Sequence, residues 1–182
     1  AQGRYDATIS VQPKSDWVTR TLFDQEARAG NWAKADAALN SALANKMLPE
    51  AEAVGHKAVL ALLQSVDAEK DGNPVEAMKL AKLAHGEDTS LVPAACQYSR
   101  LLTGMGKRSK ASGVIETTWA RQPHPDLAAA YWHTKDEEDA LARMKHAETL
   151  AAKNSGDDAS RLLLAGAAIE AGLWGVAREN LD

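Results

Sequence analysis

An alanine recurs in this sequence five residues after a turn that ends a helical stretch. The turn and its alanine appear at residues 30–35, 72–77, 106–111 and 172–177, and a copy without the glycine lies at 135–140. The alanines are residues 35, 77, 111, 140 and 177, so their spacings are 42, 34, 29 and 37. A turn that recurs at this period between two helical segments predicts an all-α solenoid of about five helix-turn-helix repeats.

The residue types within each copy indicate which kind of repeat this is. In tetratricopeptide repeats, the first helix carries a Leu-small pair and an aromatic residue, and the second carries two small residues seven apart. The fourth copy follows this pattern closely, with Leu127-Ala128, Tyr131, Ala140 and Ala147. Small residues are needed where the helices of adjacent repeats cross closely. We therefore predict a tetratricopeptide-like, right-handed α-solenoid.

The same turns, together with the prolines, indicate the domain organisation. Residues 1–14 are predicted to be a lead-in or linker segment, and residues 15–182 a repeat domain that is a fragment of a longer protein. Within that domain, Asp126 is the N-cap candidate after the stiff Pro123-His124-Pro125 connection. Trp17, Trp32, Trp119 and Trp174 recur at similar repeat positions, which predicts that they belong to the core.

Composition excludes several classes of function. The net charge is −4 and no basic block occurs, which argues against nucleic-acid binding. Cys96 is the only cysteine, so no intrachain disulfide can form. No apolar run approaches the ~20 residues needed to cross a bilayer. Any membrane attachment is therefore expected through a segment outside this fragment.

Catalytic and metal sites have no sequence support. The five histidines are scattered without ligand spacing, so no metal site is predicted. No Cys-x-x-Cys-His motif occurs, so covalent heme attachment is not expected. Cys96 has no partner base in the sequence pattern, which makes it a poor nucleophile candidate. The acidic run at 136–139 lies where a helix begins, and negative charge is favourable there.

Solenoid repeats bind partners on the concave face that their first helices form. By repeat register, this partner-binding face is predicted to include Arg20, Asp24, Arg100, Trp132 and His133, with Cys96 beside them. Arg100 could pair with a carboxylate of a partner peptide or of a porphyrin propionate, or it could be solvated or paired within the chain. His133 and Arg100 are the weak candidates for non-covalent heme binding.

Several stretches of the chain resemble one particular family. They are residues 30–35, 57–60, 91–95, 115–128 and 168–178, and the segment from Trp119 to Leu127 is the most specific of them. They resemble the C-terminal tetratricopeptide region of the HemY family of bacterial inner-membrane proteins, over about residues 16–181. The resemblance implies a role in late protoheme synthesis and no catalytic residues. It also implies a place at the inner membrane, with this domain on its cytoplasmic side.

The sequence thus predicts a non-enzymatic interaction scaffold whose partners are other proteins, heme-biosynthesis enzymes among them. No resident cofactor is expected under this hypothesis. One alternative is a porphyrin or heme carrier that uses His133 and Arg100. Another is a structural protein of membrane organisation.

Overall fold

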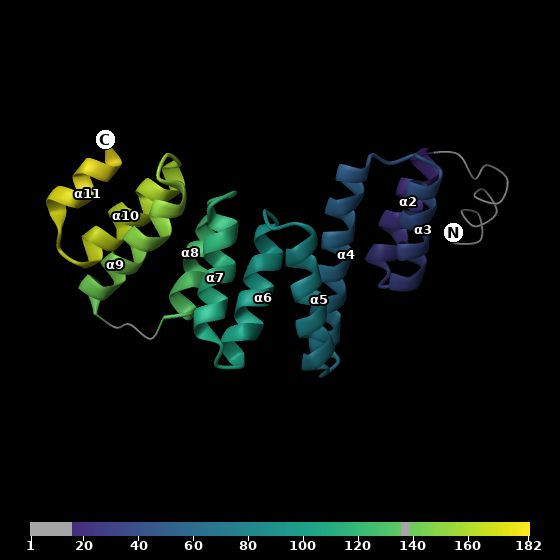
Figure 1. Ribbon diagram of the computed structural model, residues 1–182, viewed down its shortest axis with the longest axis horizontal. Helices are drawn as coiled ribbons and strands as arrows, with labels where there is room; N and C mark the ends of the chain where they lie inside the picture. Colours follow the sequence, from purple (N-terminus) through teal and green to yellow (C-terminus); the bar gives the residue numbers. More distant parts are fainter. Residues whose placement is uncertain (1–15, 136–138) are drawn as a thin grey trace. The chain divides into compact units, whose positions relative to one another are not determined.

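The computed structural model of the chain describes residues 16–135 and 139–182, and these residues form only helices and connections. Ten α-helices and one short 3₁₀ helix follow one another in these residues, and helices that are joined by a short turn pack antiparallel as pairs, as in a helical repeat (Figure 1). The predicted all-α class is confirmed. The elements are α2 (Asp16–Arg28), α3 (Trp32–Ala44), α4 (Glu50–Lys70), α5 (Pro74–Glu87), α6 (Val92–Gly104), α7 (Arg108–Trp119), α8 (Pro125–His133), α9 (Ala140–Ala151), η1 (Ala152–Asn154), α10 (Asp158–Glu170) and α11 (Trp174–Leu181).

The chain divides into two compact units, Ala1–Asp88 (unit 1) and Thr89–Asp182 (unit 2). In unit 1, α2 packs on α3, α4 packs on α5, and α3 also contacts α4. In unit 2, α6 contacts α7 and α8, while α10 packs between α9 and α11. The predicted lead-in at 1–14 and residues 136–138 of the acidic run lie outside the described residues.

Four of the repeated turns close in the same way. Gly30, Gly72, Gly106 and Gly172 have φ angles of 73°, 74°, 74° and 71°, a left-handed conformation that glycine adopts without a β-carbon penalty. The alanine that follows each turn by five residues is buried, with 0% exposure at Ala35, Ala77 and Ala111 and 4% at Ala177. Ala140, which follows the turn without glycine, is only half-buried. The repeat pattern therefore marks the close helix crossings in four of its five copies.

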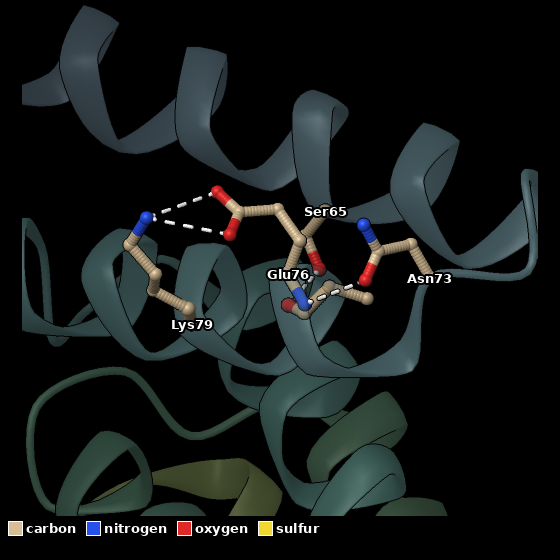
Figure 2. A network of polar contacts seen from close by, with 5 residues as sticks. Ser65, Asn73, Glu76 and Lys79 are labelled. Atoms are coloured by element: carbon tan, nitrogen blue, oxygen red, sulfur yellow. Dashed lines mark hydrogen bonds and ion pairs between the residues drawn. The ribbon is translucent and has the colours of Figure 1, made fainter.

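A buried serine joins the two helices of a pair in each unit. Ser65 Oγ of α4 donates to the carbonyl of Ala77 at 2.7 Å, and Ser99 Oγ of α6 donates to the carbonyl of Ala111 at 3.3 Å. Figure 2 shows the first of these contacts beside the start of α5, where Asn73 caps the helix by accepting from the backbone N–H of Glu76. Each serine lies twelve residues before the repeated alanine, so the bond recurs at the same repeat position in two of the five copies.

The helix α8 begins differently from the prediction. Asp126 is not the N-cap; His124 takes that position, and its Nδ1 accepts from the backbone N–H of Asp126 at 3.1 Å. The reason is Pro125, which has no N–H to be capped and whose fixed φ suits the first helical position. The cap therefore moves to the residue before the proline, and Asp126 lies in the first turn.

The core of unit 2 contains most of the large buried side chains. Trp119 is 1% exposed, and its indole Nε1 donates to Ser160 Oγ at 2.9 Å, which joins α7 to α10. Trp32 is half-buried and packs against the core of unit 1. The prediction that Trp174 also belongs to the core is wrong, because its side chain is 67% exposed. Trp174 is the first residue of α11.

Candidate protein-binding groove

A groove runs between the first helices of the two pairs in unit 1, with a volume of about 420 Å³. We call it the α2–α4 groove. Its walls come from one side of α2, from one side of α4, and from the turn that leads into α3. The residues that line it are Phe23, Asp24, Ala27, Arg28, Gly30, Trp32, Val59, Leu60, Leu63 and Asp67.

The floor of the α2–α4 groove is apolar and fixed by packing. Phe23 is 8% exposed, and its ring meets that of His56 edge to face, with the centroids 5.1 Å apart. His56 Nδ1 lies 2.8 Å from the carbonyl of Glu52 and donates to it, which holds the imidazole in place. Leu60 is 4% exposed beside them. The floor is therefore preformed, so a ligand would not have to order it.

The wall on α4 leaves apolar surface open to solvent. Val59 and Leu63 are each 39% exposed and stand four residues apart, so they lie one above the other on the same side of the helix. α4 is able to expose them because Ala58, Ala61 and Ser65 take the buried side against its neighbours. Burying an aliphatic side chain of this size stabilises a complex by roughly 1.5–3 kcal/mol relative to full exposure, and less where the side chain is already partly covered.

Charged groups stand at the edges of the α2–α4 groove. The Asp24 carboxylate and the Arg28 guanidinium form no ion pair within residues 16–135 and 139–182. Asp67 pairs with Lys70 at 3.1 Å, an exposed contact between residues three apart. Such exposed pairs contribute only about 0–1 kcal/mol and yield easily to a better partner. The groove therefore offers an apolar floor with a carboxylate on each wall and one guanidinium.

The residues predicted for the partner face fall in both units. Asp24 lines the α2–α4 groove in unit 1. Arg20 belongs to α2, and the prediction for its side chain lies outside the described residues. Arg100, Trp132 and His133 belong to unit 2, and none of them lines the α2–α4 groove.

Each candidate in unit 2 has a distinct environment. Arg100 Nη2 donates to Gln97 Oε1 of its own helix at 2.9 Å. Trp132 is half-buried and packs against the cluster around Met144, while its ring meets that of Tyr131 edge to face at 5.9 Å. His133 is exposed at the last residue of α8. Trp132 therefore contributes at least part of its surface to packing between helices.

Cys96 is half-buried on α6, with its Sγ 3.7 Å from the carbonyl of Asp126. Burial, with a smaller contribution from the negative charge of Asp126, raises the pKa of the thiol to about 11. The thiol therefore stays protonated at neutral pH, and a protonated thiol is a weak nucleophile. No group of three or more His, Cys, Asp or Glu residues in the described part of the chain is arranged to hold a metal ion.

Sequence reasoning missed the apolar residues of the groove wall. Val59 and Leu63 were not among the predicted partner residues, and Trp32 was assigned to the core alone. A signal was present in the sequence: the helix at 50–70 has apolar residues on more than one side, and Val59 and Leu63 form a second stripe beside the buried one. Amphipathic helices of ordinary surface repeats carry a single such stripe.

The fold and the groove define an all-helical protein of antiparallel helix pairs with an apolar groove between first helices. No protein-family model matches the chain. It is similar to a protein of Magnetospirillum gryphiswaldense described as the probable magnetosome protein Mms48, with 27% identity over 162 residues. The match covers 87% of this chain and 35% of that relative, so the chain spans about a third of the relative's length. Among the described residues, no helix combines the length and the apolar character that crossing a membrane requires.

Proposed function

We propose that this chain is a non-enzymatic scaffold domain of tetratricopeptide-like repeats that holds a segment of another protein in the α2–α4 groove. The observation that carries the proposal is the partly exposed pair Val59 and Leu63 above the packed floor of Phe23 and Leu60. A partner segment would place an apolar side chain on this surface. A basic residue of the segment would then meet Asp24, and an acidic one would meet Arg28.

The repeat architecture supports this choice of site. First helices of a solenoid present their free sides to partners, because their other sides are used in stacking on neighbouring helices. Eight of the ten residues that line the α2–α4 groove come from the first helices α2 and α4. A right-handed solenoid of about five repeats is part of the proposal.

The cellular setting is also proposed. The similarity to a probable magnetosome protein of a bacterium supports the proposal that this protein is bacterial and is associated with a membrane structure. A place at the bacterial inner membrane, with this domain on the cytoplasmic side, rests on the resemblance to the HemY family. An association with late heme synthesis, and the use of His133 and Arg100 by a porphyrin, rest on that resemblance alone.

The test begins with a photo-crosslinking amino acid placed at Leu63 in the protein within its native cells. The matched control carries the same group at Val75, which is 73% exposed on α5 and does not line the groove. A protein captured from position 63 and not from position 75 is then purified, and its affinity for the purified chain is measured by calorimetry.

The purified partner is expected to bind the unchanged chain and Val75→Asp equally, and Leu63→Asp at least about tenfold more weakly, which corresponds to about 1.4 kcal/mol. Circular dichroism and urea unfolding establish that both variants fold. Equal affinity of Leu63→Asp and the unchanged chain would show that the α2–α4 groove is not the binding site. Identical capture from both positions would argue against a specific scaffold.

A further inference from the structure

A second groove, of about 390 Å³, lies where the connection from α3 meets the first half of α4. We call it the α3–α4 groove, and it shares no lining residue with the α2–α4 groove. Its floor is apolar, with Leu48 at 7% and Ala53 at 2% exposure. The residues that line it are Leu43, Lys46, Leu48, Ala53, Val54 and Lys57.

Lys46 holds an unusual backbone conformation at this groove. Its φ is 54°, and it is the only residue other than glycine with a positive φ in the described part of the chain. Lys46 ends α3 in the manner of a glycine C-cap, since its own N–H bonds to the carbonyl of Leu43 and the N–H of Met47 bonds to that of Ala42. A β-carbon is unfavourable in this conformation, and four other turns of the chain use glycine for it. Lysine at this position therefore costs stability that glycine would not cost.

The charges of the α3–α4 groove have one sign. Lys46 and Lys57 are the charged residues among its lining, and no carboxylate is part of it. Neither ammonium group forms an ion pair within residues 16–135 and 139–182. Lys57 is half-buried and Lys46 is exposed. A negative group that reached both lysines would gain two charge-assisted contacts beside an apolar floor.

We propose that the α3–α4 groove binds an acidic segment of a partner protein, with an aliphatic side chain on Leu48 and Val54 and a carboxylate between Lys46 and Lys57. This is a second binding site, independent of the α2–α4 groove. A protein segment fits the observations better than an anionic lipid surface does. Attraction to lipid surfaces generally takes clusters of about four to eight basic residues. Here there are two, in a chain whose net charge is −4.

The probe is a panel of short fluorescein-labelled peptides, each with two aspartates around one Leu, Ile or Val. Every peptide has a partner in which asparagine replaces aspartate. Binding to the full chain is measured by fluorescence anisotropy at low and high salt. At least one acidic peptide is expected to bind, more tightly than its asparagine partner by about tenfold or more, and more weakly as salt rises.

Three variants assign the site. Lys46→Gly and Lys57→Gln should each weaken the binding by about tenfold, whereas Lys34→Gln, an exposed lysine of α3 outside both grooves, should not change it. Lys46→Gly should at the same time leave the melting temperature unchanged or raise it, because glycine relieves the left-handed conformation. Loss of binding without loss of stability is a result that a merely structural Lys46 would not produce.

Two results would overturn the proposal. One is a panel in which no acidic peptide binds better than its asparagine partner at concentrations up to about 1 mM, a limit that corresponds to about 4 kcal/mol of binding. The other is binding that Lys34→Gln weakens as much as Lys46→Gly does. Sedimentation with vesicles of phosphatidylcholine that contain about one-quarter phosphatidylglycerol separates the lipid alternative. If vesicles bind through Lys46 and Lys57 and the peptides do not, the groove recognises lipid and the proposal fails.

Discussion

Ser65 and Ser99 show how a single hydroxyl can serve the repeat. Each is buried in a first helix and donates to the carbonyl of the repeated alanine in the second helix. A serine is small enough for the close crossing, and it satisfies its own hydroxyl there. This combination explains why a polar residue is accepted at a buried position of the repeat.

Replacing Ser65 by alanine should lower the free energy of unfolding by about 1 kcal/mol, the usual net contribution of one such hydrogen bond. Ser99→Ala should cost less, because its bond is longer, 3.3 Å against 2.7 Å. Urea unfolding followed by circular dichroism measures both changes. Ser109→Ala, at an exposed position, is the control and should change nothing. Equal stability of Ser65→Ala and the unchanged chain would contradict a stabilising role for this bond.

Tyr131 is the centre of a polar network in unit 2. Its ring is fully buried, its hydroxyl donates to Glu116 Oε1 at 3.4 Å, and Glu116 Oε2 pairs with Lys153 at 3.0 Å. Burial is the main cause that raises the pKa of Tyr131 to about 12, and the charge of Glu116 and the hydrogen bond to it act in the same direction. The folded state therefore holds the phenol proton more tightly than the unfolded chain does.

The pH dependence follows from this raised pKa. Below pH 10 the phenol is protonated in both states, so its contribution to stability is fully present. Between pH 10 and about 12 the unfolded chain loses the proton first, so stability falls as pH rises, by at most about 1.4 kcal/mol per pH unit. Tyr131→Phe removes this contribution. In urea titrations, the stability advantage of the unchanged chain over Tyr131→Phe should shrink across that window, and a constant difference would contradict the assignment.

The buried carboxylate of Glu26 could not be predicted from the sequence. Glu26 is 0% exposed, nine residues before its repeated alanine, where two other copies place Leu102 and Tyr131. Its Oε2 accepts from Asn31 Nδ2 at 2.7 Å, while Oε1 has no hydrogen-bond partner in the part of the chain that the structure describes. A carboxylate is costly to bury at such a position. Its burial could not be predicted from residue type, because it depends on the asparagine that the turn brings beside it.

At the scale of elements, helix starts and ends were largely predictable. Glycine acts locally through φ, so the predicted turns at residues 30, 72, 106 and 172 each lie two residues after the end of a helix, namely α2, α4, α6 and α10. The grooves were harder to foresee, because they arise where two helices leave a space between their side chains. Asp24 could be assigned to a first-helix face by register, but Val59 and Leu63 required knowledge of which side of α4 meets its neighbours.

Two substitutions on helix α7, one at a buried and one at an exposed position, should change stability in opposite directions. Ala111 is 0% exposed at a helix crossing, so Ala111→Leu should overpack it and cost about 1–3 kcal/mol of stability. Gly113 is exposed in the helix interior, and an added β-carbon would meet no atom within 4 Å. Gly113→Ala should therefore stabilise the protein by about 0.5–1 kcal/mol. Thermal and urea unfolding measure both, and a shift of the same sign in the two variants would contradict this account.

At the scale of the whole molecule, the division into two units has consequences for folding. Unit 2 contains its own buried aromatic and aliphatic residues, among them Trp119, Ile115 and Leu127. The sequence predicts one repeat domain at 15–182, because a related turn recurs along it, and this stays a prediction.

A fragment of residues 89–182 should fold on its own and unfold cooperatively in urea. Ser160→Ala removes the acceptor of the Trp119 indole, whose bond joins α7 to α10 within this unit. The substitution should lower the stability of the fragment and of the full chain by the same amount, about 1 kcal/mol or more for a buried donor left unsatisfied. A gradual, non-cooperative transition of the fragment would show that unit 2 depends on unit 1.

The serine bonds of Ser65 and Ser99 bear on how quickly the chain can fold. Each joins residues only twelve apart, so the bond can form after a short loop closes. Chains dominated by such near-neighbour contacts reach their native state rapidly. During synthesis, a helix pair could close as soon as its second helix has left the ribosome, before the following pair exists. The apolar side of each helix would then be covered soon after synthesis by the other helix of its pair. Because exposed apolar surface promotes aggregation, early pairing reduces aggregation of the growing chain.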